Sequence, residues 1–181
     1  MDCHGVAELE GKGACVRILG IDPGLGRMGF GLVEVAANGG LSSNCWGMLT
    51  TPSNTPDAER LQILYNDLAD LIETTRPDCV ALERIFYFQN ATTMVPVTQA
   101  RGVIVLRLGQ FNLPFGEYTP MQVKQAVAGH GKAKKPEVQQ TVQSLLGLDK
   151  LPRPDDAADG LALAVCHYLH TRSLGLVATA G

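Results

Sequence analysis

Apolar residues along the chain fall into two patterns, short aliphatic or β-branched runs and longer stretches with helical spacing. The first run, Val16–Asp22, ends at Pro23-Gly24, which predicts a strand followed by a turn. The runs Met28–Val35 and Leu41–Thr50 predict two more strands, and the turn signal Asn38-Gly39-Gly40 lies between them. We therefore expect these three strands to form an antiparallel meander.

Helical spacing begins after the third run. Leucines that recur mostly three or four residues apart predict a helix that begins at Thr55 or Asp57 and ends at Arg76-Pro77. Strands are expected at Cys79–Glu83 and Phe115–Tyr118. Further helices are expected over Ala91–Leu108, Pro120–Ala128, Pro136–Leu146 and Asp155–Thr171. This order of elements predicts an α/β fold, a mixed five-stranded sheet flanked by helices.

Composition favours a single globular domain. The chain has 181 residues, of which 45% are hydrophobic and 18% charged, which favours a packed core over disorder or a membrane bundle. We expect a loose extension over residues 1–15, a domain over 16–171 and a tail over 172–181. The five cysteines form no C-x-x-C pair, and the sequence has no apolar signal segment and no run long enough to span a membrane. A cytoplasmic location is therefore expected.

Acidic residues stand where three predicted elements begin or end. Asp22 ends the first strand, and Glu83 ends the strand that follows the first helix. Asp156 and Asp159 lie three residues apart at the start of the last helix, hence on one face. Each position has an ordinary alternative. Asp22 can be a turn residue and Glu83 a salt-bridge partner, and Asp156 or its neighbour Asp155 can be an acid that stabilises the helix N-terminus.

Carboxylates gathered in a protected cleft repel one another unless something offsets their charge. Hard divalent cations do so with oxygen ligands, and Mg²⁺ typically takes one or two carboxylates together with phosphate oxygens. Two such ions about 3.5–4 Å apart can activate water and stabilise the leaving oxygen of a phosphodiester. The pattern therefore favours metal-dependent phosphodiester hydrolysis, provided that the acids converge.

Basic residues are concentrated in the middle of the chain, although the net charge is −3. From Arg84 to Lys135 the sequence has seven basic residues and one acidic residue. Lys132, Lys134 and Lys135 stand just ahead of a predicted helix start, where a cation opposes the helix dipole. Phosphate binding explains their position, and a solvated charged turn is the alternative.

Five motifs occur in the order VRILGIDPGLGRMGFGLVEV, VALERIFYFQNATT, QARGVIVL, EYTPMQVKQAVAGHGKAKKPEVQQTVQSLLGL and DDAADGLALAVCH. Together they resemble the RuvC-type Holliday-junction resolvases, from about Val16 to His170. The resemblance implies a ribonuclease H-like fold and a homodimer that nicks two opposed strands of a four-way DNA junction with Mg²⁺ or Mn²⁺. It implies that the catalytic, metal-binding acids are Asp22, Glu83, Asp156 and Asp159, with Asp155 as an exposed neighbour.

The same resemblance implies roles for basic and aromatic residues. Lys124 and Lys135 match basic active-site positions of the family, and Lys132 and Lys134 would be supplementary phosphate contacts. Phe86 matches the aromatic residue that stacks on a base at the junction centre, whereas burial in the core is the ordinary role of a phenylalanine. Tyr87 and Phe88 have no assigned role.

The predicted helix Ala91–Leu108 is too apolar to face water on any broad side, so it is either a core helix or a dimer interface. Two cuts on opposed strands need two active sites related by a two-fold axis, and the family uses this region at its interface. The resemblance also implies a branch-migration helicase complex as a partner. His167, over two helical turns beyond Asp159, is expected to be structural, and His130 is a candidate phosphate contact.

The expected reaction is hydrolysis by metal-activated water with two Mg²⁺ or Mn²⁺ ions per active site, leaving a 5′-phosphate and a 3′-hydroxyl. A relative acting on RNA or simple duplexes and an architectural junction-binding protein remain alternatives; the latter needs the basic surface but no carboxylate cluster. The segment G-I-D-P-G also resembles the first phosphate loop of actin-like phosphotransferases, but the sequence has no second such loop and no adenosine site. A P-loop motif is absent.

Overall fold

The computed structural model describes residues 15–85 and 91–173, and side chains from Met94 onward in the second range. The described elements in chain order are β1 (Val16–Asp22), β2 (Arg27–Val35), β3 (Leu41–Thr50), α1 (Asp57–Thr75), β4 (Cys79–Glu83), α2 (Ala91–Gln110), β5 (Phe115–Tyr118), α3 (Pro120–Ala128), α4 (Lys135–Leu146) and α5 (Asp155–Ser173). Every element predicted from the sequence is present, and the ends differ by one or two residues, as helix and strand ends commonly do. The proposed extension, apart from Cys15, and the tail beyond Ser173 lie outside the described residues.

The strands form one sheet in the order β3-β2-β1-β4-β5. β1, β2 and β3 pair antiparallel, which confirms the predicted meander, whereas β4 pairs parallel with both β1 and β5. Ile21 lies opposite Leu82, so the carboxyl ends of β1 and β4 meet at one edge of the sheet. Asp22 and Glu83, the last residues of these strands, are therefore neighbours.

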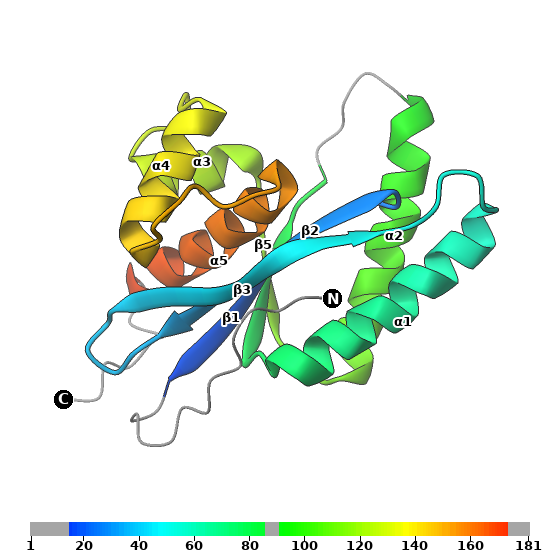
Figure 1. Cartoon of the computed structure of the whole chain (residues 1–181), viewed down its shortest axis with the longest axis horizontal. Coiled ribbons are helices and arrows are strands. Elements are labelled where there is room, and N and C mark those ends of the chain that lie inside the picture. The colour runs from blue at the N-terminus through cyan, green and yellow to red at the C-terminus, as the bar shows by residue number, and fades with distance from the viewer. Residues whose placement is uncertain (1–14, 86–90, 174–181) are drawn as a thin grey trace.

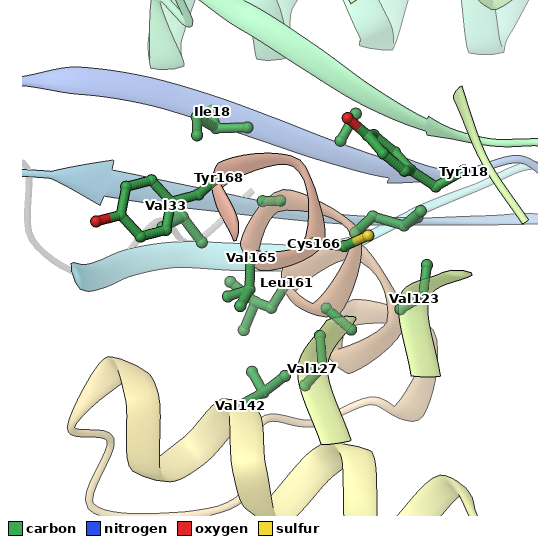
Figure 2. Packing of buried hydrophobic residues seen from close by; sticks show 14 of the residues in the cluster. Ile18, Val33, Tyr118, Val123, Val127, Val142, Leu161, Val165, Cys166 and Tyr168 are labelled. Atoms are coloured by element: carbon green, nitrogen blue, oxygen red, sulfur yellow. The ribbon is translucent and has the colours of Figure 1, made fainter. Parts of the chain in front are cut away.

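Helices cover both faces of the sheet (Figure 1): α3, α4 and α5 lie on one side, and α1 and α2 on the other. Each interface has its own apolar cluster. On the first side, Leu161 and Val165 of α5 pack between Ile18 and Val33 of the sheet and Val142 of α4 (Figure 2). On the second side, leucines of α1 and the buried face of α2 cover the sheet. The continuous burial along the middle of β1 and along β2 after Arg27 follows from this coverage of both faces.

α5 approaches the sheet more closely than residues with side chains would permit. A Cβ atom added at Gly20 would lie 1.9 Å from the carbonyl oxygen of Gly160, and one added at Gly29 would lie 2.0 Å from that of Asp156. Because glycine lacks this atom, the backbone of α5 rests directly on β1 and β2. The contact at Gly29 fixes the first turn of α5 beside the end of β1, since Gly29 pairs with Asp22.

α2 is only half-buried in the single chain. Ala100, Ile104 and Leu108 face the core, whereas the exposed fractions of Val95 and Leu106 are 57% and 55%. The alternative of a fully buried core helix is therefore wrong for the isolated chain, and an apolar face remains open. Among the described residues, none of the helices combines the length and the apolar character of a membrane span.

Candidate active site

Three of the predicted acids converge where the sheet edge meets the start of α5. Asp22, Asp156 and Asp159 each place a carboxylate oxygen within 4.8 Å of the other two. Glu83 joins the cluster through a side-chain hydrogen bond with Asp22. The cluster therefore combines the ends of β1 and β4 with one face of α5, although these segments are far apart in the sequence.

The cluster holds Asp22 in an unusual protonation state. Burial, the hydrogen bond and charge of Glu83, and the charge of Asp156 together raise the pKa of Asp22 to about 8, and Lys135 offsets only part of this. Burial also raises the pKa of Asp159, which the hydrogen bond from Lys135 opposes. The repulsion among these carboxylates is thus only partly relieved by the side chains around them.

This donor set fits a hard divalent cation. It offers carboxylate oxygens from rigid elements, the ligand type that Mg²⁺ and Mn²⁺ prefer. A bound cation would also relieve the repulsion that raises the pKa of Asp22. Asp22, Asp156 and Asp159 are the residues placed to share one ion, and Glu83 is placed beside them.

A pocket of about 220 Å³ opens next to the cluster, and Asp22, Glu83 and Asp159 line one part of it. Both predicted active-site lysines, Lys124 of α3 and Lys135 of α4, line another part. Lys135 donates a hydrogen bond of 2.7 Å to Asp159 Oδ2, which raises the lysine pKa even though burial lowers it. The pocket therefore pairs carboxylates with cations, as a site for a phosphodiester and metal ions requires.

The position of α3, and with it Lys124, follows from its first residues. Thr119 accepts a hydrogen bond from the backbone N–H of Gln122, and the Gln122 side chain accepts one from the backbone N–H of Thr119. This reciprocal capping box, followed by Pro120, starts the helix directly after β5.

The other predicted basic contacts do not line this pocket. Lys134 is exposed at the N-cap of α4, and Lys132 lines a separate groove with Met121 and His170. His130 pairs with Glu137 at 2.8 Å. The predictions for Phe86, Tyr87 and Phe88 lie outside the described residues.

His167 lies in a small polar network away from the pocket. Its Nδ1 is 2.9 Å from the Tyr118 hydroxyl and its Nε2 is 3.4 Å from Cys79 Sγ. Burial lowers the pKa of His167 and raises that of Cys79 to about 11. These contacts join α5 to β4 and β5, in agreement with the structural role that its position predicted.

Sequence reasoning missed Arg27, the first residue of β2. Its Nε lies 3.5 Å from Asp156 Oδ2. The neighbouring acid Asp155 is exposed and pairs instead with Arg153, at 2.6 Å, as expected of a residue outside the cluster. The short turn between β1 and β2 indicates only that the first residues of β2 lie near Asp22, whereas the contact of Arg27 with Asp156 depends on the strand register.

Comparison with known proteins gives one consistent result. The family model described as crossover junction endodeoxyribonuclease RuvC matches residues 18–167. A RuvC from Thermomicrobium roseum is 48% identical over 163 residues, covering 89% of this chain and 98% of the relative. A RuvC from Chloroflexus aurantiacus is 52% identical over 152 residues, covering 84% and 92%.

A solved structure gives the same assignment. The chain is similar to Thermus thermophilus RuvC in complex with Holliday junction substrate, with a TM-score of 0.80, 30% identity, and coverage of 89% of this chain and 98% of that one. The predicted ribonuclease H-like fold, a mixed five-stranded sheet flanked by helices, is confirmed.

Proposed function

This chain belongs to the RuvC family of crossover junction endodeoxyribonucleases, and we propose that it resolves four-way DNA junctions by paired nicks on opposed strands of like polarity. The observation that carries the proposal is the convergence of four carboxylates from β1, β4 and α5 beside a pocket with two lysines. An architectural junction-binding protein would need the basic residues, but it would not need a cluster of carboxylates whose mutual repulsion destabilises the fold.

Asp22, Glu83, Asp156 and Asp159 would hold two Mg²⁺ or Mn²⁺ ions per active site. When bound, such a pair of ions supplies a nucleophile from water and stabilises the leaving oxygen of the phosphodiester. The strand ends and the backbone contact of α5 with Gly29 fix the backbone that carries these carboxylates, so accepting the ions needs only side-chain rotation.

Lys135 and Lys124 act on the substrate from the other side of the pocket. Lys135 holds a positive charge at Asp159, where it can bind a phosphate oxygen and offset charge that develops during cleavage. Lys124 adds a second contact from α3. The products would be a 5′-phosphate and a 3′-hydroxyl. Lys132, Lys134 and His130, all exposed, would contact phosphates farther along the arm, and Phe86 would stack on a base at the junction centre.

Two nicks on opposed strands require a second active site. The open apolar face of α2, with Val95 and Leu106, supports a homodimer in which two copies of the helix meet about a two-fold axis. A branch-migration helicase complex is the proposed partner and the cytoplasm the proposed location.

A cleavage assay with paired variants tests this function. The wild type should nick a labelled four-way junction with Mg²⁺ or Mn²⁺ at symmetrically related positions, and leave a linear duplex and an RNA–DNA hybrid of the same sequence uncut. Asp22→Asn should bind the junction nearly as well as wild type and cut it at least about 10³-fold more slowly, since it removes a group that acts in the chemical step.

Asp155→Asn is the matched control, because Asp155 is an exposed acid adjacent to Asp156 and pairs outside the cluster. It should cut at nearly the wild-type rate. Wild-type cleavage by Asp22→Asn, or nicking of simple duplexes as fast as of junctions, would contradict the proposal.

A further inference from the structure

The carboxylate cluster has a cation on each of two sides, and they come from different elements. Lys135 of α4 lies 2.7 Å from Asp159 and lines the pocket. Arg27 of β2 lies 3.5 Å from Asp156, and neither Arg27 nor Asp156 is part of the pocket lining. Asp156 is thus held from the sheet side, outside the lysine-lined pocket.

The pair is asymmetric in its exposure. The side chain of Arg27 is 69% exposed, whereas that of Asp156 is 25% exposed. A guanidinium has five N–H donors in a planar fork, and the single contact through Nε leaves most of them facing solvent. Arg27 therefore pairs with a ligand of the proposed metal site at its solvent-exposed edge, and the charge of Asp156 offsets the attraction of Arg27 for any other anion.

We propose that Arg27 exchanges Asp156 for a backbone phosphate of the DNA when the site is loaded with metal. Without a cation, Arg27 neutralises part of the charge of Asp156. When Asp156 turns to a cation, Arg27 loses its partner and is left at the rim of the site, where the nearest available anion is a phosphate of the bound strand. This inference rests on the proposed function, since it takes the cluster to bind divalent ions and DNA.

The exchange makes metal and DNA binding cooperative. Because free-energy coupling between two ligands is reciprocal, loading the site with metal strengthens DNA binding by the same factor by which DNA strengthens metal binding. The ion pair to be broken is solvent-exposed on the arginine side, and such pairs are weak, so Asp156 can leave Arg27 readily. Arginine suits the second role, because its fork binds phosphate oxygens with two hydrogen bonds.

The first test measures DNA binding of Arg27→Gln with and without a divalent cation. A fluorescent four-way junction is mixed with protein in EDTA or in Ca²⁺. Binding is followed by stopped-flow fluorescence anisotropy, so that it is recorded before any cleavage of the junction. Arg153→Gln is the matched control, because Arg153 is 70% exposed and pairs with the acid next to Asp156. In Ca²⁺, Arg27→Gln should bind about five- to tenfold more weakly near 0.1 M salt, with a salt slope smaller by about one per protomer.

In EDTA, Arg27→Gln should bind within about twofold of wild type, since Arg27 is then engaged by Asp156. Arg153→Gln should match wild type in both conditions. An equal loss in EDTA and in Ca²⁺ would show a constant DNA contact rather than an exchange, and no loss in Ca²⁺ would show no contact at all. Either result overturns the inference.

The second test uses no DNA, so it is independent of junction specificity. Free Mn²⁺ is measured by electron paramagnetic resonance during titration of each protein. Arg27→Gln should bind Mn²⁺ about two- to fivefold more tightly than wild type, because a competing cation is gone, and Arg27→Lys should return the affinity toward wild type. Unchanged or weaker Mn²⁺ binding by Arg27→Gln overturns the exchange, whereas a wild type that binds Mn²⁺ but neither prefers nor cuts junctions contradicts the proposed function instead.

Discussion

Replacement of Gly29 by alanine should reduce catalysis far more than folding, because at Gly29 β2 touches the backbone of the first turn of α5, which carries Asp156. The added Cβ would lie 2.0 Å from the Asp156 carbonyl oxygen and 2.5 Å from its carbonyl carbon. Ordinary contact begins at 3.4 Å, so the first turn of α5 must move by about 1.4 Å. Both contacts are with backbone atoms, which cannot turn aside as the end of a flexible side chain would.

This displacement is large relative to the cluster, whose three oxygens lie within 4.8 Å of one another. A misplacement of about 1 Å in an active site can reduce the rate by about 10²-fold. Overpacking should lower the free energy of unfolding by about 1–3 kcal/mol. Alanine has a better strand propensity than glycine, which should raise it again by about 0.5–1 kcal/mol. The fold should therefore survive while cleavage falls by about two orders of magnitude.

The assay is single-turnover cleavage of a labelled four-way junction at saturating Mg²⁺, with urea unfolding of the same preparation to establish the folded fraction. Gln62→Ala on α1 is the control, because Gln62 is exposed and lies outside both the carboxylate cluster and the open face of α2. It should change stability by less than about 0.5 kcal/mol and cleave normally. A folded Gly29→Ala protein that cuts at the wild-type rate would refute the claim that this backbone contact positions Asp156.

Four further outcomes follow from the structure. The pKa of Asp22 is raised from 3.8 to about 8 on folding, so the free energy of unfolding of the metal-free protein should fall as pH rises from about 4 to 8. Urea unfolding in EDTA measures this, and a free energy of unfolding that rises over this range contradicts the shift. For the same reason Mn²⁺ affinity should increase by up to about tenfold per pH unit below pH 8, with proton release in calorimetry; a pH-independent affinity would speak against it. Lys135→Met should slow single-turnover cleavage by about 10²–10³-fold, and rates within twofold of wild type would remove Lys135 from the mechanism. Thr119→Ala should cost about 1 kcal/mol in urea unfolding through loss of the cap, whereas an unchanged midpoint would show that the capping box is dispensable.

Strand ends were the part of the site that the sequence predicted best. Asp22 and Glu83 each follow a short apolar run, and once the two runs are adjacent parallel strands their last residues must meet. The placement of Asp156 and Asp159 on one face of α5 followed from helical spacing. Which of the neighbouring acids Asp155 and Asp156 joins the cluster came from family resemblance, because the exact phase of a helix start is not fixed by periodicity.

Contacts that depend on strand register, or on the absence of a Cβ atom at glycine, could not be predicted from the sequence. The glycines of β1 and β2 are equally compatible with turns or bulges, so only the structure shows that the backbone of α5 packs directly against them. The pair between Arg27 and Asp156 depends on the register of β2 against β1, which a short turn alone does not specify. The exposure of α2 depends on what covers it, because an apolar helix looks the same in a core and at an interface.

The most direct measurement is a crystal structure of the wild type grown with Mn²⁺, with data collected at the manganese absorption edge. Two anomalous peaks should lie among the carboxylates of Asp22, Glu83, Asp156 and Asp159, and the guanidinium of Arg27 should have left Asp156. Manganese bound only elsewhere on the protein, with Asp156 still paired with Arg27, would contradict the account.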